Sequence, residues 1–342
     1  MKTEVCGGEN LRKLRFAVIG LGKMGLLHAS LLNTYKDIQL VALCDKSALM
    51  TRLCRSIFSP TGKVVVNDLD RFSELELDAV YVTTPISSHA FIVKDLYAKG
   101  IVRNVFTEKT LASNYAQAKE MCEIAGKIGG KTMVGYMKRF SVVFGKAKEL
   151  LTQGRLGEPY SFSAYAYSSD FLGLTNESRS SASRGGALKD IGCHVLDLAL
   201  WLLGDVRVED VVSSNEVGGA ETSVCFTAVS PSGLEGRFDV SQRMPGYRMP
   251  EFGCIIDCPQ GKIEVNDDRL LLTLRSGSQE VWYRHDLNDN VGYSLGETEY
   301  YREDLAFVNS LLGNRMCEPN FETASKVDYI IDQVDKMIAE RE

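Results

Sequence analysis

The sequence lacks the features that mark a protein for nucleic acid or for a membrane. Acidic residues outnumber basic ones, and the formal net charge is −6. Nucleic acids and anionic membranes both need a cationic surface, which this balance does not favour. The chain also contains no uninterrupted run of about 18 apolar residues, the length that a transmembrane helix requires. We therefore expect no nucleic acid and no membrane as a partner, but a small molecule.

A disulfide framework and a zinc site are missing as well. The nine cysteines are an odd number and include no C-x-x-C pair. The closest two, Cys254 and Cys258, lie in an apolar, strand-like run. This pattern predicts reduced thiols and no metal site. Residues 1–13 contain no apolar signal core, so we interpret them as an N-terminal extension and expect a cytoplasmic protein.

The length of 342 residues and a hydrophobic content of 44% predict two folded cores. In residues 14–136, short β-rich runs alternate with helical segments, which predicts an α/β fold with a doubly wound, parallel Rossmann sheet. In residues 137–342, helices are followed by closely spaced runs of alternating hydrophobicity. These runs predict an α+β domain with a large, mostly antiparallel, open sheet. We expect the first domain to bind a dinucleotide, and the second to bind the substrate and form the oligomer.

A glycine motif supports the dinucleotide site. Gly20, Gly22 and Gly25, with Lys23 and Met24 between the last two, follow an apolar strand and precede a helical run. In a G-x-G-x-x-G turn the first glycine permits the bend, the second lets the pyrophosphate approach, and the third lets helix and strand pack closely. The N-terminus of the helix then receives the phosphates.

Asp45 provides the second part of this pattern. It ends the second predicted strand about twenty residues beyond Gly25, the offset of a carboxylate that binds ribose hydroxyls. Because such a carboxylate repels a 2′-phosphate, NAD is the expected cofactor, while Lys46 and Arg52 are close enough in sequence to leave NADP open. Asp45 can also cap the following helix, and the two roles are compatible.

Lys109 follows the fifth predicted strand, at the carboxyl edge of the sheet where ligands of open α/β folds bind. An exposed lysine at a strand end is an equally good interpretation of this position. A second cluster, GGALKDIGCH, opens a helix predicted from about Leu188 to Leu203. Asp190 and His194 are four residues apart and share one face of this helix, with Asp197 on the same side.

Other polar residues are weaker candidates. Lys138 and Arg139, at the predicted domain junction, are candidates for lining a cleft, and Arg139 for binding substrate. The long polar loop before Gly186 carries Arg179 and Arg184, and arginine suits carboxylate or phosphate recognition, which leaves an acidic or nucleotide-linked sugar open. Two further observations are interpreted as structural. The Y-x-x-x-K spacing of Tyr115 and Lys119 falls in an amphipathic helix, and His28 and His285 are expected to be structural or solvent-facing.

These motifs resemble the Gfo/Idh/MocA family, named for glucose-fructose oxidoreductase and inositol dehydrogenase, across nearly the whole chain. The resemblance rests on the glycine motif, the Glu108-Lys109 pair, the D-x-x-x-H segment and the GYMKRF junction. It implies that Lys109, Asp190 and His194 are catalytic and also bind substrate. Residues near the cofactor are implied to include Thr84, Pro85, His89, Glu108 and Lys109. For His89, a histidine at the start of a helix is an equally good interpretation. The family usually has proline where this chain has Thr110, so the placement of Lys109 is expected to be looser.

The resemblance implies hydride transfer between nicotinamide and a carbinol carbon of a sugar, a polyol or a derivative of one. In the oxidation direction His194, with an imidazole pKa near its ordinary value, acts as general base. Lys109 stabilises the developing negative charge, and Asp190 orients the substrate or the imidazole. A redox-neutral, NAD-dependent glycosidase and a non-catalytic dinucleotide sensor remain alternatives. We expect a homodimer or homotetramer that forms through the C-terminal sheet.

Overall fold

The computed structural model describes residues 12–58, 62–172, 185–216, 221–287, 289, 298–313 and 315–341. The chain divides into two compact units, each held together by its own internal contacts. The first unit contains residues 1–108, 123–133 and 304–317, and the second contains residues 109–122, 134–303 and 318–342. Each unit is thus built from three separate stretches of sequence. The continuous domain limits at residues 14, 136 and 137 stay a prediction.

A six-stranded sheet carries the first unit, with the strand order β3-β2-β1-β4-β5-β6. The strands are β1 (Leu14–Ile19), β2 (Ile38–Cys44), β3 (Val64–Val66), β4 (Ala79–Val82), β5 (Asn104–Thr107) and β6 (Thr132–Val134). The registered pairs among β1 to β5 are all parallel. Because β1 and β4 are neighbours in the middle, the strand order reverses there, which is where a doubly wound sheet binds its ligand. The predicted Rossmann fold is confirmed.

Helices connect these strands. They are α1 (Lys23–Leu32), α2 (Ala48–Phe58), α3 (His89–Ala98) and α4 (Tyr115–Ile128), with 3₁₀ turns η2 (Leu69–Glu74) and η3 (Ile86–Ser88). The central strands are buried on both faces, as expected of a parallel sheet between helices. Aromatic rings fill part of this core, with Tyr81 stacked on Phe106 at 4.3 Å between ring centroids.

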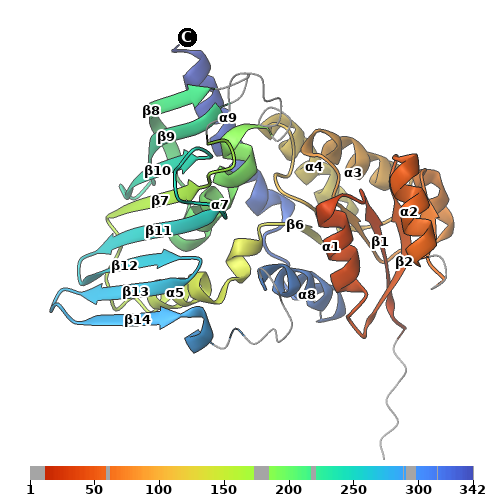
Figure 1. The fold of residues 1–342 in the computed structure, drawn as a ribbon, viewed down its shortest axis with the longest axis horizontal. Helices are drawn as coiled ribbons and strands as arrows, with labels where there is room; N and C mark the ends of the chain where they lie inside the picture. The colour runs from red at the N-terminus through yellow and green to blue at the C-terminus, as the bar shows by residue number, and fades with distance from the viewer. Residues whose placement is uncertain are drawn as a thin grey trace, which may run out of the picture. The chain divides into compact units, whose positions relative to one another are not determined.

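An eight-stranded sheet carries the second unit, with the order β14-β13-β12-β11-β7-β10-β9-β8. The strands are β7 (Ser161–Tyr167), β8 (Arg207–Glu216), β9 (Glu221–Val229), β10 (Glu235–Ser241), β11 (Glu251–Cys258), β12 (Gly261–Asn266), β13 (Arg269–Leu274) and β14 (Gln279–Tyr283). All registered pairs are antiparallel except β7 with β10, which is parallel. The predicted large, mostly antiparallel sheet is confirmed (Figure 1).

Helices pack on this second sheet or continue the chain around it. They are the 3₁₀ turns η4 (Met137–Phe140) and η6 (Arg284–Leu287), the π-helical turn η5 (Leu188–Gly192), and α5 (Val142–Thr152), α7 (Cys193–Leu203) and α9 (Phe321–Ala339). Helix α8 (Glu299–Gly313) begins in the second unit and continues, from Asp304 onward, in the first. Helix α7 packs on β7 and β11, α5 on β12 and α9 on β8. Along β7 every second residue is buried, so one face of the sheet lies under these helices.

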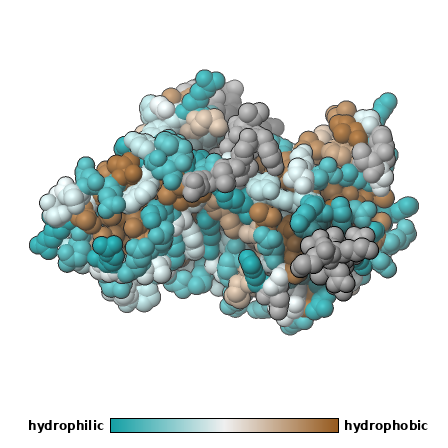
Figure 2. Space-filling model, turned by 90° about the horizontal axis from the view of Figure 1, so that it is seen from below, coloured by the Kyte–Doolittle hydropathy of each residue, from teal (hydrophilic) through white to brown (hydrophobic). Residues whose placement is uncertain are grey.

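No helix in the described part of the chain is long and apolar enough to span a membrane. Figure 2 shows hydrophilic and hydrophobic residues interspersed on the face of the molecule that it presents. The expected cytoplasmic location stays a prediction.

Candidate functional site

The glycine turn between β1 and α1 has the geometry that the motif predicts. Gly20 has a φ of +93°, and a Cβ there would lie 2.8 Å from the backbone nitrogen of Thr84. A Cβ on Gly25 would lie 1.7 Å from the carbonyl oxygen of Gly20, so this glycine lets α1 pack against the turn. At Gly22, by contrast, a Cβ would meet none of the described atoms within 4 Å. The turn therefore leaves space for a ligand beside Gly22.

The N-terminus of α1 is suited to an anion. Gly22 is its N-cap residue, and no described side chain caps it. Lys23 and Met24 form the first helical positions and are not buried. The backbone N–H groups of a first helical turn carry partial positive charge and need acceptors. A pyrophosphate at this position would supply those acceptors.

Asp45 follows β2 and binds the glycine turn directly. Its Oδ2 accepts a hydrogen bond from the backbone N–H of Leu21 at 2.6 Å, and its Oδ1 accepts one from Ser47 at 2.7 Å. The side chain that caps α2 belongs to Ser47, whose Oγ accepts from Met50 at 3.3 Å. Because an ionised carboxylate can accept about four hydrogen bonds, Asp45 can hold the turn and still bind ribose hydroxyls.

The exit from β4 is held by side chains that bind backbone. His89 is completely buried, and its Nε2 lies 2.8 Å from the carbonyl oxygen of Thr84. Thr83, which the sequence analysis did not single out, donates from Oγ1 to the carbonyl oxygen of Gly20 at 2.7 Å. Pro85 is the N-cap residue of η3. These contacts connect the β4 exit to the glycine turn and fix the shape of both loops.

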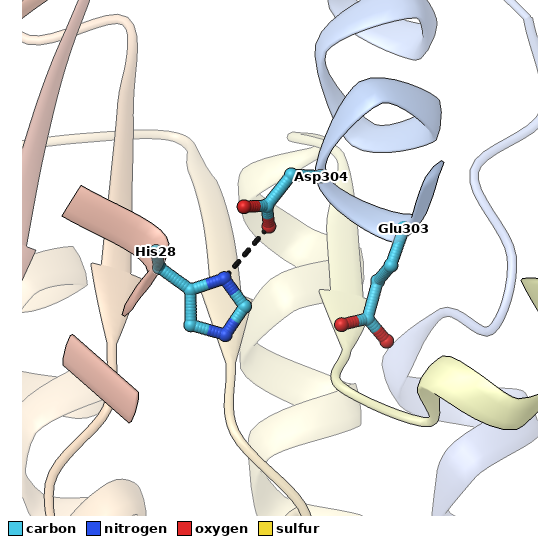
Figure 3. A group of neighbouring side chains, drawn as sticks. All are labelled: His28, Glu303 and Asp304. Atoms are coloured by element: carbon cyan, nitrogen blue, oxygen red, sulfur yellow. Dashed lines mark hydrogen bonds and ion pairs between the residues drawn. The ribbon is translucent and has the colours of Figure 1, made fainter. Parts of the chain in front are cut away.

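Glu108, predicted near the cofactor, faces a buried histidine in the structure. Its Oε1 lies 3.0 Å from Nε2 of His28. On the other side of the ring, Nδ1 of His28 lies 2.8 Å from Oδ1 of Asp304 (Figure 3). Burial alone would lower the pKa of His28, but the carboxylates of Asp304 and Glu108 outweigh this and raise it well above its ordinary value. His28 is therefore a charged, structural residue, and both of its ring nitrogens bind carboxylates.

In the second unit, the structure brings Lys109 to Asp190. Lys109 Nζ donates to the backbone carbonyl oxygen of Asp190 at 2.5 Å and lies 3.6 Å from its Oδ1. The other carboxylate oxygen of Asp190 accepts from Nε2 of Gln242 at 2.7 Å. Lys109 and Asp190 each retain about a fifth of their side-chain exposure, at 20% and 18%. Both side chains are thus oriented by polar contacts and still reach solvent.

Asp190 lies in the π-helical turn η5, and His194 follows in the first turn of α7. The sequence predicted one continuous α-helix here and did not predict the wider turn. Such π turns inside helices occur frequently at functional sites. In this one the backbone carbonyl of Asp190 binds the side chain of Lys109.

His194 is a buried, neutral imidazole. Burial lowers its pKa well below the ordinary value, and the charges of Lys109 and Lys138 lower it further. Its Nδ1 has no hydrogen-bond partner among the described residues. The ring packs edge-on against Phe252, with centroids 5.1 Å apart. The assumption of an imidazole pKa near its ordinary value was therefore wrong, because two lysines and an apolar ring surround this side chain.

The remaining cations predicted at the site have carboxylate partners. Arg139 makes two hydrogen bonds to Asp197, at 2.7 and 2.6 Å, and both side chains are almost fully buried. Lys138 is buried, with Nζ 2.9 Å from Oδ1 of Asp267 and 5.0 Å from the centroid of the Phe252 ring. The guanidinium of Arg139 is thus engaged by Asp197. Two other predicted residues, Arg179 and Arg184, lie outside the described residues.

In the second unit, three site residues escaped the sequence analysis: Gln242, Asp267 and Phe252. Each lies within or just after a β-strand of the second sheet, and none belongs to a local motif. Only the pairing of distant strands brings Gln242 to η5, Phe252 to α7 and Asp267 to Lys138 in η4. No signal in the sequence alone would have identified them.

Together, a reversed strand order, a glycine turn at an uncapped helix and a carboxylate after β2 define a dinucleotide-binding protein. Two family models agree with this class. Residues 14–136 match the family described as "Oxidoreductase family, NAD-binding Rossmann fold". Residues 144–264 match the GFO/IDH/MocA C-terminal domain. The chain belongs to the GFO/IDH/MocA oxidoreductase family, whose NAD-binding Rossmann model matches residues 14–136.

Relatives include a D-glucoside 3-dehydrogenase from Escherichia coli, 32% identical over 202 residues, which are 58% of this chain and 56% of that enzyme. The match thus spans less than two thirds of the relative. A myo-inositol 2-dehydrogenase from Thermotoga maritima is 26% identical over 290 residues, 79% of this chain and 81% of the relative. A solved structure of levoglucosan dehydrogenase with NADH has a TM-score of 0.83 and 18% identity, and covers 96% of this chain and 98% of that one. At this identity the last match shows the fold.

Proposed function

We propose that this protein is an NAD-dependent dehydrogenase that oxidises a carbinol carbon of a neutral sugar or polyol. The observation that carries the proposal is the meeting of Lys109, Asp190 and a neutral His194 in the second unit. The relatives named as glucoside and inositol dehydrogenases support the substrate class. A structural helix would not need a solvent-reaching lysine beside a buried, neutral imidazole.

The residues of the first unit fit NAD. The cradle beside Gly22 and the N-terminus of α1 would hold the pyrophosphate, and Asp45 would bind the ribose hydroxyls. The carboxylate of Asp45 also disfavours a 2′-phosphate, which supports NAD over NADP. When bound, the nicotinamide ring supplies the acceptor for the hydride.

The second unit would manage the proton and the charge of the substrate hydroxyl. Because the pKa of His194 is lowered, its imidazole is in the neutral form that accepts a proton at pH 7. Lys109, with its ammonium group held by Asp190, would stabilise negative charge on the substrate oxygen as the proton leaves. Asp190, held in turn by Gln242, would accept a hydrogen bond from a neighbouring hydroxyl.

The cations that the structure describes among the predicted site residues favour a neutral substrate. The cations of Lys109, Lys138 and Arg139 are each paired with a carboxylate, from Asp190, Asp267 and Asp197 respectively. An anionic substrate would need an additional unpaired cation, since burying a charge without a partner is costly. A polyhydroxylated substrate, which exchanges hydrogen bonds with such pairs, fits this balance.

A substrate panel tests the proposal. The purified protein is incubated with NAD or NADP and with inositols, aldoses and sugar acids, and NADH formation is followed by absorbance. We expect turnover with NAD on a neutral polyol or sugar, and loss of turnover with intact NAD binding in Lys109→Met. Reduction of NAD by sugar acids alone would contradict the neutral substrate. Tightly retained NAD with glycoside cleavage and no net NADH would instead indicate the redox-neutral enzyme.

We also propose that the second sheet forms a homodimer or homotetramer. The face of β7 away from the helices carries Tyr165 and Tyr167, which are only half-buried and stack at 4.8 Å between ring centroids. Open sheet faces with such aromatic residues are suited to self-association. Light scattering should show an oligomer, and Tyr165→Lys combined with Tyr167→Lys should shift it toward the monomer. A wild-type monomer at micromolar concentration would contradict this proposal.

A further inference from the structure

Helix α9 presents three aspartates on one face. Asp328, Asp332 and Asp335 are four and three residues apart, the spacings that place side chains next to one another on a helix. The face points into the second unit, where Asp328 is only 3% exposed. A carboxylate at such depth needs partners, while Asp332 and Asp335 are only partly buried.

The first two aspartates hold the segment that follows Lys109. Oδ1 of Asp328 accepts a hydrogen bond from the backbone N–H of Ala112 at 3.3 Å, and Oδ2 of Asp332 accepts one from Tyr115 at 2.9 Å. Tyr115 is the first residue of α4, so the Asp332 carboxylate also lies where the helix dipole favours negative charge. The backbone after Lys109 is therefore anchored to α9 at two points.

The third aspartate contacts the segment that carries Asp190. Oδ2 of Asp335 lies 3.6 Å from Nζ of Lys189, the residue directly before Asp190 in the π-helical turn. This pair is partly exposed, and pairs of this kind contribute little to stability. The pair matters for its position. One face of α9 contacts both the segment after Lys109 and the segment before Asp190, and Lys109 and Asp190 meet at the proposed site.

Burying the carboxyl group of Asp328 at this position costs free energy. Burial raises the pKa of its carboxyl well above the ordinary value. Its Oδ2 has no hydrogen-bond partner among the described residues. An apolar residue would fill a buried helix position without this cost. Among the described contacts of this side chain, the hydrogen bond from Ala112 explains an aspartate here.

We propose that α9 positions the catalytic lysine, with Asp328 as the principal positioning residue and Asp332 as its neighbour in the same function. By holding the backbone of Ala112 and Tyr115, these carboxylates set the direction from which Lys109 leaves the strand end and meets Asp190. The inference rests on the proposed function in that it takes Lys109 as the catalytic lysine.

Kinetics of matched variants test the proposal. Asp328→Ala removes the acceptor, whereas Asp328→Asn keeps an amide oxygen that can accept from Ala112. Since small misplacements of a catalytic group are amplified at an active site, we expect Asp328→Ala to lower kcat about tenfold or more. The KM values for substrate and NAD should stay within about twofold, because neither ligand contacts this residue. Asp328→Asn should restore most of the loss.

A control on the same helix separates positioning from general damage to α9. Lys326 forms an exposed pair with Asp205 at 2.7 Å, and Lys326→Ala should leave kcat unchanged. Equal kcat in Asp328→Ala and Lys326→Ala would overturn the proposal, as would an Asp328→Asn variant as impaired as the alanine. If Asp328→Ala does not fold, as judged by thermal unfolding, the pair Asp332→Ala and Asp332→Asn is measured in the same way.

Chemical labelling gives a readout that does not depend on turnover. The intact proteins are acylated briefly with an amine reagent, and the modification of Lys109 is measured by peptide mass spectrometry. Lys109 should react several-fold faster in Asp328→Ala than in wild type, Asp328→Asn or Lys326→Ala. Equal labelling would overturn the inference even if the wild type is an active dehydrogenase. Failure of every substrate would remove the proposed function, while faster labelling would still support the anchoring of Lys109.

Discussion

Each of the two units contains a buried histidine that is surrounded by charged side chains, and the two sets of charges shift the histidine pKa in opposite directions. In the first unit, His28 lies between Asp304 and Glu108, and these carboxylates raise its pKa. In the second, burial lowers the pKa of His194, and Lys109 and Lys138 lower it further. Both rings are almost completely buried. The sign of the neighbouring charges therefore decides which ring is cationic and which is neutral.

The difference in charge state distinguishes a structural histidine, His28, from the proposed catalytic histidine, His194. The imidazolium of His28 donates from both nitrogens and connects α1, α8 and the end of β5 within the first unit. Neither nitrogen has capacity for a further acceptor. The neutral ring of His194 has a lone pair for a substrate proton. The same residue type thus serves as a cross-link in one unit and as a proposed base in the other.

The largest expected effect is on turnover. Replacing a general base lowers kcat by about 10²- to 10⁴-fold, so we expect His194→Gln to lose that much activity while NAD binding is retained. His28→Gln should keep kcat within about tenfold, because His28 contacts no reacting group in this scheme. Steady-state kinetics and NAD titration check both variants. Similar losses of kcat in the two variants would break the proposed distinction.

For the free energy of unfolding, we expect the larger effect at His28. His28→Ala leaves two buried carboxylates without their cation, a defect that costs about 3 to 5 kcal/mol. The exposed His285 provides the control, since its side chain is 80% exposed and His285→Ala should change stability by less than about 0.5 kcal/mol. Urea denaturation measures both. An unchanged midpoint for His28→Ala would show that the cluster does not stabilise the fold.

The pH dependence of stability should have opposite signs at the two rings. The raised pKa of His28 means that the folded state binds more protons than the unfolded state above about pH 6.5, so its stabilising contribution is lost as pH rises through the folded pKa. The lowered pKa of His194 means that the unfolded state binds more protons below about pH 6.5, so stability falls as pH falls toward the folded pKa.

Denaturation of wild type, His28→Gln and His194→Gln between about pH 5 and 9 measures these contributions, each limited to about 1.4 kcal/mol per pH unit. Relative to wild type, His28→Gln should flatten the alkaline side of the profile, and His194→Gln the acid side. Two difference curves with the same sign would contradict the assignment of charge states.

The smallest effect is expected at Gln242, which donates to Asp190 and carries no charge. Removing one neutral donor to a carboxylate costs about 1 to 2 kcal/mol, or roughly five- to thirtyfold in kcat/KM. Gln242→Leu should show this loss in steady-state kinetics, and Gln242→Asn a partial loss because its amide is shorter. A Gln242→Leu enzyme with unchanged kcat/KM would show that Asp190 does not depend on this donor.

Several elements could be predicted because they depend on neighbours in sequence. The alternation of strands and helices around Gly20, Gly22 and Gly25 predicts the parallel sheet and a tight glycine turn before a helix, and the structure shows both. The second sheet could also be predicted, because closely spaced runs of residues alternate between hydrophobic and polar side chains. Prediction ended where partners are distant in sequence: the pairing of Arg139 with Asp197 and the contact of Gln242 with Asp190 follow from no local pattern.

By itself, the sequence determined the two sheets, the glycine turn, the position of Asp45 and the choice of Lys109, Asp190 and His194 as candidates. These depend on backbone geometry and on periodicity, which operate over a few residues. Only the tertiary structure decided that Glu108 binds His28, that α9 anchors the segment after Lys109, and that His194 is neutral. The physical reason is that charge state depends on burial and on the charges packed within a few ångströms, and packing brings together residues far apart in the chain.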